Sequence, residues 1–327
     1  MKLDFTFSDT LAGYIIEYNA AEKWYTVETS DKRVFKVNLL PSTYARTFRN
    51  LDESYQDASG VMQDLLAQKG QFLYSYGTFY PPVEGGEPVF EVQWIIFPST
   101  KPHEYRHEAQ DWWIQQISSI ATSYLKWQFN YPQEPINYKN YRTMLHLAGA
   151  KKGDYLQETD TISRMIYGFA SAYMLTGNDS FLEGAELGTE YLRDHMRFYD
   201  KDADLVYWYH GVKVDGQKET KLLTSEFGDD LDSLPMYEQI YALAGPTQTY
   251  RLTGDPRIMW DIEKTIELFE KYFKDDKLEG YYSHIDPISL DAHEESLAHN
   301  RARKNWNSVG DHAPAYLINL YLATGEK

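Results

Sequence analysis

The chain has 327 residues, 43% of them hydrophobic, carries a formal net charge of −17 and contains no cysteine. The missing cysteines exclude disulfides and thiolate chemistry, and a strongly negative chain without a basic tract disfavours nucleic acid as a partner. No apolar run approaches the ~18 residues that cross a bilayer, and Asp4 interrupts what would be the apolar part of a signal peptide. We therefore expect no membrane partner and a cytoplasmic location.

Residues 1–100 predict a small β-rich domain, for which a barrel is one option. Runs rich in β-branched and aromatic residues predict strands, and Pro81-Pro82 with Gly85-Gly86 marks the break before the last of them. The expected strands are 11–18, 24–30, 33–38, 72–76 and 89–97, and the expected short helices are 44–51 and 58–68. We find no catalytic constellation here, so we expect a docking or oligomerisation role.

From residue 101 onward the pattern becomes helical. The segment 130–155 is a long polar connection, 278–305 a second irregular one, and 206–214 with 219–227 predicts a β-hairpin around Asp215-Gly216. The expected helices are 105–129, 159–176, 181–196, 232–252, 255–273 and a last one that opens at Asp311. The second is capped at 159–161, and the fourth has a kink at Gly245-Pro246. The expected buried faces are Trp113, Ile117, Ile120, Ala121, Tyr124 and Leu125 in the first helix, and Ile162, Met165, Ile166, Phe169, Tyr173 and Met174 in the second.

Three of these helices end in the same way, with Thr-Gly followed by a polar residue. Glycine is expected just past a helix C-terminus, because it enters the left-handed conformation at little cost. The stops lie at Thr176-Gly177, Thr253-Gly254 and Thr324-Gly325. The recurrence predicts a mainly α domain over 101–327, built from repeated helical hairpins as in an α/α toroid.

If the repeat helices run parallel, their N-termini and the long connections gather at one end, where we expect the site. The first turns Asp232-Ser-Leu-Pro-Met-Tyr237 and Asp311-His-Ala-Pro-Ala-Tyr316 share a pattern that helix capping by Asp also explains. Capping does not require His312. The positive helix end disfavours imidazolium, so His312 suits a general base, although a histidine bonded to a loop remains an alternative.

Other polar residues at this end also have two readings each. Arg164, one turn into its helix, could clamp a substrate oxygen or pair with Glu158 or Asp160. Asp229, Asp230 and Asp232 could form an acid/base pair, a metal site or simple caps. The run 200–204 imitates a calcium loop but lacks its glycine and its final glutamate, so we expect neither a metal nor a cofactor.

Two motifs resemble the N-acylglucosamine 2-epimerase and cellobiose 2-epimerase superfamily. They are Arg164-Met-Ile-Tyr-Gly-Phe-Ala-Ser-Ala-Tyr173, which precedes a Thr-Gly turn, and Asn307-Ser-Val-Gly-Asp-His-Ala-Pro-Ala-Tyr-Leu-Ile-Asn-Leu-Tyr321. The resemblance implies an (α/α)6 toroid whose histidines epimerise or isomerise sugars by proton transfer. It also implies that Arg164 is the family's mouth arginine and that His312 is the second histidine of its Asn-x-His-x-His motif.

The departures from the family pattern matter for catalysis. Gly310 stands where the motif has its first histidine, and Ala315 stands where it has a glutamate. The family's later histidine motifs would lie beyond Lys327, and three hairpins are about half of a toroid. We therefore expect either a fragment of a longer protein or an open half completed by a partner, such as a second copy or a further C-terminal portion.

The resemblance favours an epimerase or isomerase acting at C2 of a sugar, with His312 and Arg164 catalytic. The residues expected to bind the sugar are Tyr167, Trp208, His210, Asp230, Tyr237 and Trp306. One alternative is an inactive sugar-binding or scaffolding protein on the same fold, which Gly310 and Ala315 suggest. A weaker alternative is an α/α-toroid glycoside hydrolase that uses Asp229, Asp230 or Asp232.

Overall fold

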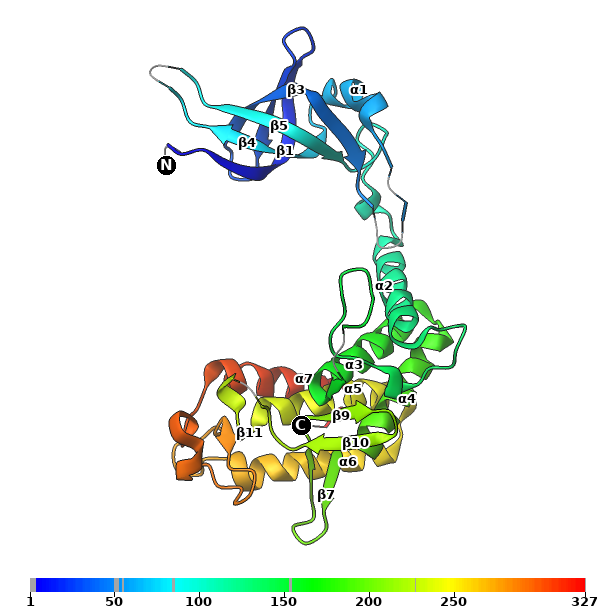
Figure 1. Ribbon diagram of the computed structural model, residues 1–327, viewed down its shortest axis with the longest axis vertical. Coiled ribbons are helices and arrows are strands. Elements are labelled where there is room, and N and C mark those ends of the chain that lie inside the picture. The colour runs from blue at the N-terminus through cyan, green and yellow to red at the C-terminus, as the bar shows by residue number, and fades with distance from the viewer. Residues whose placement is uncertain are drawn as a thin grey trace. The chain divides into compact units, whose positions relative to one another are not determined.

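The computed structural model describes residues 4–49, 53–54, 56–83, 86–152, 155–226 and 228–326, apart from the side chains of Asn307 and Ser308. The chain divides into two compact units, Met1–Ser119 and Ile120–Lys327, both visible in Figure 1. None of the helices in the described ranges has the length and apolar character needed to cross a membrane.

The first unit contains a closed five-stranded barrel with the strand order β1-β2-β3-β5-β4 (Figure 1). The strands are β1 (Phe7–Asn19), β2 (Trp24–Thr29), β3 (Val34–Thr47), β4 (Phe72–Tyr80) and β5 (Val89–Phe97). The pair β3–β5 is parallel, and the other neighbours are antiparallel. A 3₁₀ turn (Ser59–Val61) and the short helix α1 (Met62–Leu66) lie between β3 and β4. This is the strand order of an OB-fold barrel.

Period-two alternation fills the barrel, because successive side chains of a strand point to opposite faces. In β4, Leu73 and Phe79 are buried, and the buried hydroxyl of Ser75 lies 2.6 Å from that of Tyr25, so this inward polar pair is satisfied. Burial raises the pKa of Tyr25. The expected strands are confirmed in place, with those at 11–18, 33–38 and 72–76 longer than expected, and helical turns lie within the expected 58–68. The break at Gly85 lies outside the described residues.

The helix expected at 44–51 is wrong. Residues 44–47 finish β3, where Ala45 and Thr47 point into the barrel while Tyr44 faces solvent. This in-and-out alternation is that of a strand, and it outweighs the local helical tendency. Residues 50 and 51 lie outside the described residues.

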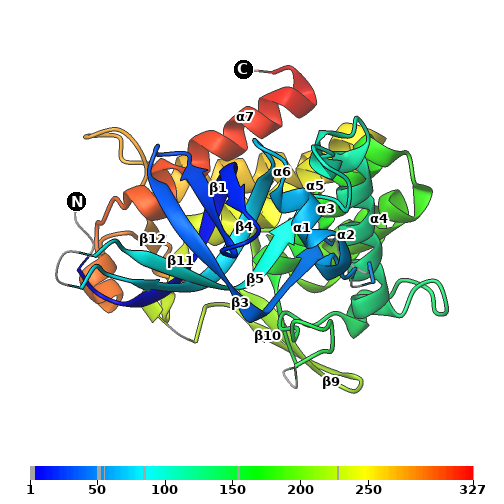
Figure 2. The same ribbon diagram turned by 90° about the horizontal axis from the view of Figure 1, so that it is seen from above.

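The second unit is built from helical hairpins (Figures 1 and 2). Its helices are α2 (Trp112–Phe129), which begins in the first unit, α3 (Thr159–Thr176), α4 (Asp179–His195), α5 (Met236–Thr253), α6 (Pro256–Leu268) with a π-helical continuation (Phe269–Phe273), and α7 (His312–Thr324) after a π-helical turn (Trp306–Gly310). The predicted helices are thus confirmed in place, although the first begins at Trp112 instead of residue 105.

The buried faces match the predicted ones only in part. In α2, Ala121, Leu125 and Phe129 are buried, whereas Trp113, Ile120 and Tyr124 of the expected stripe are exposed. In α3, Ile162, Ile166 and Phe169 are buried as expected, but Met174 is exposed. Small and polar residues such as Ser163 and Ala172 occupy the closest helix contacts instead, which a hydrophobic stripe does not indicate.

The repeat helices α3, α5 and α7 run parallel, as the pairing of their side chains shows. Ser163 bonds to Ala242 near the start of α3 and α5, and Gln248 donates to Ser171 further along both, at 3.0 Å. The same order relates α5 to α7: Tyr241 bonds to His312 near the start of both helices, and Thr247 bonds to Tyr316 further along both. The helices α4 and α6 form the second layer, joined by Arg193 of α4 and Asp261 of α6.

The two ends of the repeat helices are built differently. Gly177, Gly254 and Gly325 end α3, α5 and α7 with φ of 69°, 65° and 74°, which confirms the predicted Thr-Gly stops. At the other end Asp311 is the N-cap residue of α7 as predicted, although its side chain makes no capping hydrogen bond, and the predicted caps of α3 and α5 are wrong. Glu158 precedes α3 without a side-chain cap, and Asp232, with φ of 53°, lies in the loop before Pro235, the N-cap of α5.

Neighbouring loops replace these caps. The backbone N–H of Thr159 donates to His210, and that of Met236 donates to Ser283. Short sheets support the same end: β6 (Leu156–Glu158) with β9 (Gly211–Asp215) and β10 (Lys218–Leu222), β7 (Arg197–Asp200) with β8 (Leu205–Trp208), and β11 (Leu234–Pro235) with β12 (His284–Ile285). The hairpin at Asp215-Gly216 is confirmed, but the run 206–214 splits into β8 and β9, and Phe227 lies outside the described residues.

The closest contact between α3 and α5 compensates for a proline inside α5. Pro246 has no N–H for the carbonyl of Ala242, four residues earlier. The hydroxyl of Ser163 donates to that carbonyl at 3.2 Å and accepts the N–H of Gly245 at 2.8 Å. A Cβ on Gly245 would lie 2.3 Å from the carbonyl oxygen of Ser163, so only glycine permits this approach. As a result, α5 continues through Pro246 as one helix.

We predict that Gly245→Ala destabilises the protein by about 1–3 kcal/mol, because the added methyl group must push α3 and α5 apart. Gly168→Ala is the matched control: Gly168 is an exposed glycine of α3, and its Cβ would meet nothing within 4 Å. That change should stabilise by about 0.4–1 kcal/mol. Chemical unfolding of both variants measures the difference, and equal stability of the two would contradict the packing described.

Candidate functional site

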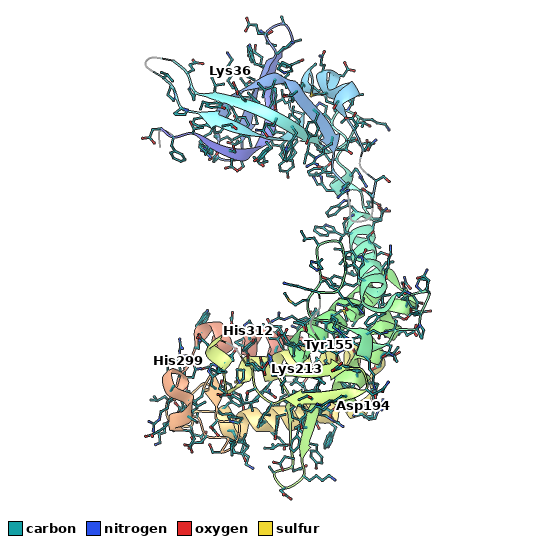
Figure 3. The ribbon with its side chains drawn as sticks, viewed as in Figure 1. Lys36, Tyr155, Asp194, Lys213, His299 and His312 are labelled. Carbon is teal, nitrogen blue, oxygen red and sulfur yellow. The ribbon has the colours of Figure 1, made fainter. Side chains whose placement is uncertain are left out.

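A pocket of about 220 Å³ lies between the first turns of α3, α5 and α7. Arg164 and Tyr167 come from α3, Tyr241 from α5, and His312 from the first residue of α7, where Figure 3 labels it. The rest of the lining is Ile240, Ala244, Ala315, Tyr316 and Asn319. The structure thus brings both predicted catalytic residues and one predicted binding residue into a single pocket.

Tyr241 connects the two predicted catalytic residues. The guanidinium carbon of Arg164 lies 4.1 Å above the centre of the Tyr241 ring, a cation–π contact. The Tyr241 hydroxyl lies 3.3 Å from Nδ1 of His312, whose Nε2 is 3.7 Å from a carboxylate oxygen of Asp311. Arg164 also pairs with Asp160 at 3.3 Å, so the ion pair considered from sequence forms as well. These contacts therefore fix the directions of the Arg164 guanidinium and the His312 ring, which both remain partly exposed to solvent.

Tyr237 extends this group on the same face of α5. Its ring centre is 6.0 Å from that of His312 and 6.0 Å from that of Tyr241. Burial raises the pKa of Tyr237, and the charges of Glu238, Asp160 and Asp230 raise it further. The hydroxyl therefore stays protonated at neutral pH, so it can donate a hydrogen bond near the pocket.

A buried pair, His210 and Glu238, lies at the start of α5, and the sequence reasoning did not single out its acid. Nδ1 of His210 is 2.7 Å from Oε1 of Glu238, and both side chains are mostly buried. Oε2 of Glu238 is buried with no hydrogen-bond partner. The sequence does hold one signal for Glu238, because it is a carboxylate in the first turn of α5 between the buried residues Met236 and Gln239. Its partner His210, however, lies far away in the sequence.

The acidic surroundings make both groups of this pair bind protons more tightly. Burial alone would lower the pKa of His210, but its hydrogen bond to Glu238 and the charges of Glu238, Glu158 and Asp160 raise it overall. Burial raises the pKa of Glu238, which His210 offsets only in part. The pair therefore retains a proton over a wider pH range than either group would alone.

The three neighbouring aspartates do not converge on the pocket. Asp230 accepts from Nε2 of the buried His284 at 2.7 Å, whereas Asp229 is largely exposed and lies 3.7 Å from His299. Asp232 is exposed in its loop, and none of the three lines the pocket. Within the described ranges, no group of three or more acidic or histidine side chains is arranged to hold a metal ion.

The two tryptophans expected to stack on a sugar lie elsewhere. Trp208 is 1% exposed, and its indole N–H donates to Thr265 of α6 at 3.1 Å, so the expectation for Trp208 is wrong: it belongs to the core. Gln239 also bonds both backbone groups of Trp208. Trp306 is 78% exposed and lies outside the pocket lining, with its ring against Gly310. A Cβ at Gly310 would be 2.7 Å from that ring.

Comparison with known proteins confirms the sequence resemblance over part of the chain. A stretch of 122 residues is 27% identical to "Cellobiose 2-epimerase" of Bacteroides fragilis and covers 36% of this chain and 26% of that protein. No protein-family profile matches the chain. The match thus spans about a quarter of the curated relative's length.

Two solved structures are similar to about two thirds of this chain. A sugar epimerase from a ruminal bacterium has a TM-score of 0.46 at 20% identity, over 65% of this chain and 51% of that one. Cellobiose 2-epimerase from Bacillus thermoamylovorans has a TM-score of 0.46 at 12% identity, over 67% and 56%. The chain thus spans about half the length of each structure.

We predict that the stability of the wild type, relative to Glu238→Gln, falls as the pH rises from about 5 to above 7. Both pKa values of the pair are raised in the folded state, so the stabilisation is complete below the ordinary values of 4.5 and 6.5 and is lost as pH rises through the folded ones. Thermal unfolding at a series of pH values measures this difference. Glu183→Gln, on the exposed face of α4, should show none. A pH-independent difference for Glu238→Gln would rule out this electrostatic account.

Proposed function

We propose that this chain, a relative of cellobiose 2-epimerase over 122 residues, carries part or all of a sugar epimerase or isomerase that moves a proton at C2. The observation that carries the proposal is the meeting of Arg164, Tyr241 and His312 in one pocket. These side chains come from two helices that are far apart in sequence and from the helix between them. Their convergence gives the two residues implied by the motifs a common substrate volume.

The proposed chemistry uses the open-chain form of an aldose. His312 takes the proton from C2, and the electron pair of that C–H bond forms the C1–C2 double bond of an enediolate while the C1 carbonyl oxygen becomes negative. The guanidinium of Arg164 stabilises that oxygen. Return of the proton to the opposite face of C2 gives the epimer, and delivery to C1, with the proton of the O2 hydroxyl passing to O1, gives the ketose. Tyr167 in the pocket, and Tyr237 and His210 beside it, would position hydroxyl groups.

The position of His312 supports its role as the base. It begins α7, and its ring lines the pocket beside Arg164 and Tyr241. The hydrogen bond between the Tyr241 hydroxyl and Nδ1 fixes the ring, and Nε2 faces a carboxylate only at 3.7 Å. In the proposed reaction Nδ1–H donates to the Tyr241 oxygen, which leaves the lone pair of Nε2 to accept the proton.

A second candidate is sugar binding without turnover, with the chain serving as a binding or scaffolding protein. Ala315 lies in the pocket wall at the position where the family motif has a glutamate, so the pocket has one carboxylate fewer than the motif implies. The hydrolase alternative has less support, because Asp229, Asp230 and Asp232 do not line the pocket.

We also propose that the hairpins belong to a toroid. The arrangement of α3, α5 and α7 as a parallel inner layer with α4 and α6 outside supports it. On α7, Leu317, Ile318 and Tyr321 are exposed next to α6, and a further hairpin of the same repeat, from more chain or from a partner, would cover such a face.

We predict that the chain incorporates deuterium at C2 when incubated with glucose, mannose or cellobiose in deuterated water, as measured by NMR. His312→Asn should slow the exchange by about 10²-fold or more while sugar binding remains. His293→Asn is the matched control, because His293 is an exposed histidine outside the pocket.

The two candidate functions give different results in this experiment. Sugar binding without exchange in the wild type, unchanged in His312→Asn, would support the non-catalytic candidate. Exchange that persists in His312→Asn would show that another group is the base. If a broad panel of aldoses neither binds nor exchanges, both candidates are overturned for this chain.

A further inference from the structure

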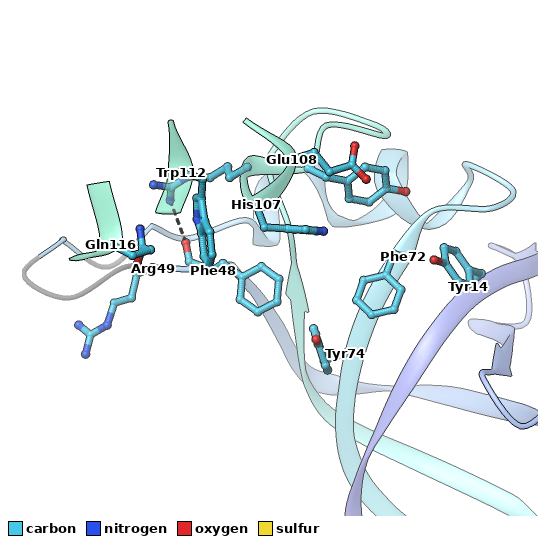
Figure 4. Close-up of a pocket in the computed structure, with 11 residues that line it drawn as sticks. Tyr14, Phe48, Arg49, Phe72, Tyr74, His107, Glu108, Trp112 and Gln116 are labelled. Carbon is cyan, nitrogen blue, oxygen red and sulfur yellow. Dashed lines mark hydrogen bonds between the residues drawn. The ribbon is translucent and has the colours of Figure 1, made fainter. Parts of the chain in front are cut away.

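The Met1–Ser119 unit has a pocket of its own, of about 530 Å³, on the outer wall of the barrel (Figure 4). Tyr14 of β1, Phe72 and Tyr74 of β4, and Phe48 just after β3 form one wall. The segment that follows the barrel forms the other wall, with Tyr105, Arg106, His107, Glu108, Trp112 and Gln116. Every lining residue belongs to this unit.

The first wall is a continuous row of aromatic rings. Tyr14 and Phe72 are directly opposite in the β1–β4 register, and their ring centres are 5.2 Å apart. Phe72 and Tyr74 follow at 5.1 Å, and Tyr74 and Phe48 at 5.3 Å, all three pairs meeting edge to face. Because Leu73 and Ser75 point into the barrel, these rings point outward, and Tyr14 is 54% exposed. They are therefore available to a ligand.

The opposite wall supplies polar groups. Arg106 is held in place by two hydrogen bonds to Glu53, at 3.0 and 2.5 Å, and by one to the carbonyl of Phe48 at 3.3 Å. The amide nitrogen of Gln116 is buried without a hydrogen-bond partner. A buried N–H donor without a partner is unfavourable, and no group among the described residues accepts this hydrogen bond, so a ligand that accepts it would be stabilised here.

We propose that this pocket binds a neutral sugar ring. The flat apolar faces of Tyr74 and its neighbours match the C–H face of a pyranose, and Glu108, His107 and Gln116 match hydroxyl groups, which both donate and accept hydrogen bonds. The volume lies in the range typical of small-molecule sites, which combine an apolar lining with a few polar groups. This site is separate from the pocket of Arg164 and His312 and does not depend on any reaction there.

A non-reacting probe separates the two sites. Methyl β-glucopyranoside and methyl α-mannopyranoside cannot open to an aldehyde, so they cannot undergo proton transfer at C2. Titration calorimetry or ligand-observed NMR on the full chain, with each glycoside up to 50 mM, measures the binding. We expect binding in the millimolar range.

Two variants test the residues. Tyr74→Ala should weaken binding at least tenfold, whereas Tyr80→Ala, on the same face of β4 but outside the pocket, should not. Gln116→Leu removes the unpartnered amide while keeping the side chain's size. It should weaken binding at least fivefold without lowering the melting temperature, so loss of folding cannot account for the result.

Three outcomes would overturn the proposal. They are no binding of either glycoside at 50 mM, binding that Tyr74→Ala leaves intact, which would place it outside this pocket, and binding that Tyr80→Ala weakens as much as Tyr74→Ala does. Failure of C2 exchange with intact glycoside binding would count against the epimerase proposal alone.

Discussion

The helical unit depends on the contact of Ser163 with the α5 turn that contains Gly245 and Pro246. The hydroxyl of Ser163 replaces the helix hydrogen bond that Pro246 cannot make, and the missing side chain of Gly245 lets the two backbones approach. Arg164 follows Ser163 in α3, and Tyr241 precedes the acceptor Ala242 in α5. The same contact therefore sets how far the guanidinium lies from the Tyr241 ring, and a small separation of the helices would open the pocket.

The loops at this end both complete the helices and supply the polar groups. The carbonyl of His210 accepts the N–H of Thr159 at the start of α3, while the His210 ring pairs with Glu238 of α5. In the same way, Ser283 accepts the N–H of Met236, and the next residue, His284, holds Asp230. The opposite end has only tight Gly turns. The end whose helix termini bond to neighbouring loops is thus also the end where the pocket of Arg164 and His312 lies.

Local signals in the sequence were enough to place most elements, but not the partners of buried polar groups. The Thr-Gly stops predicted the three helix ends because a left-handed C-terminal residue is a local requirement of the backbone. Arg164 and His312 could be found because each lies in a first turn of a repeat helix. Glu238 could not, because its partner His210 is 28 residues away and only the folding of β8 and β9 against α5 brings them together. Trp208 was misassigned for the same reason: its burial depends on Gln239 and on Thr265 of α6.

In the proposed reaction His210 and His312 have different roles, because different groups surround them. His210 faces Glu238, with Glu158 and Asp160 nearby, and its raised pKa makes it a group that keeps its proton and can donate a hydrogen bond. His312 contacts the hydroxyl of Tyr241 at 3.3 Å, and its carboxylate neighbour, Asp311, lies further away at 3.7 Å. Asp160 joins the two regions, because it acts on His210 and also pairs with Arg164 in the pocket wall. Proton-transfer sites commonly use titratable groups whose surroundings differ in this way. On this arrangement the base belongs at His312, and a substrate oxygen that becomes negative belongs on the side of Arg164.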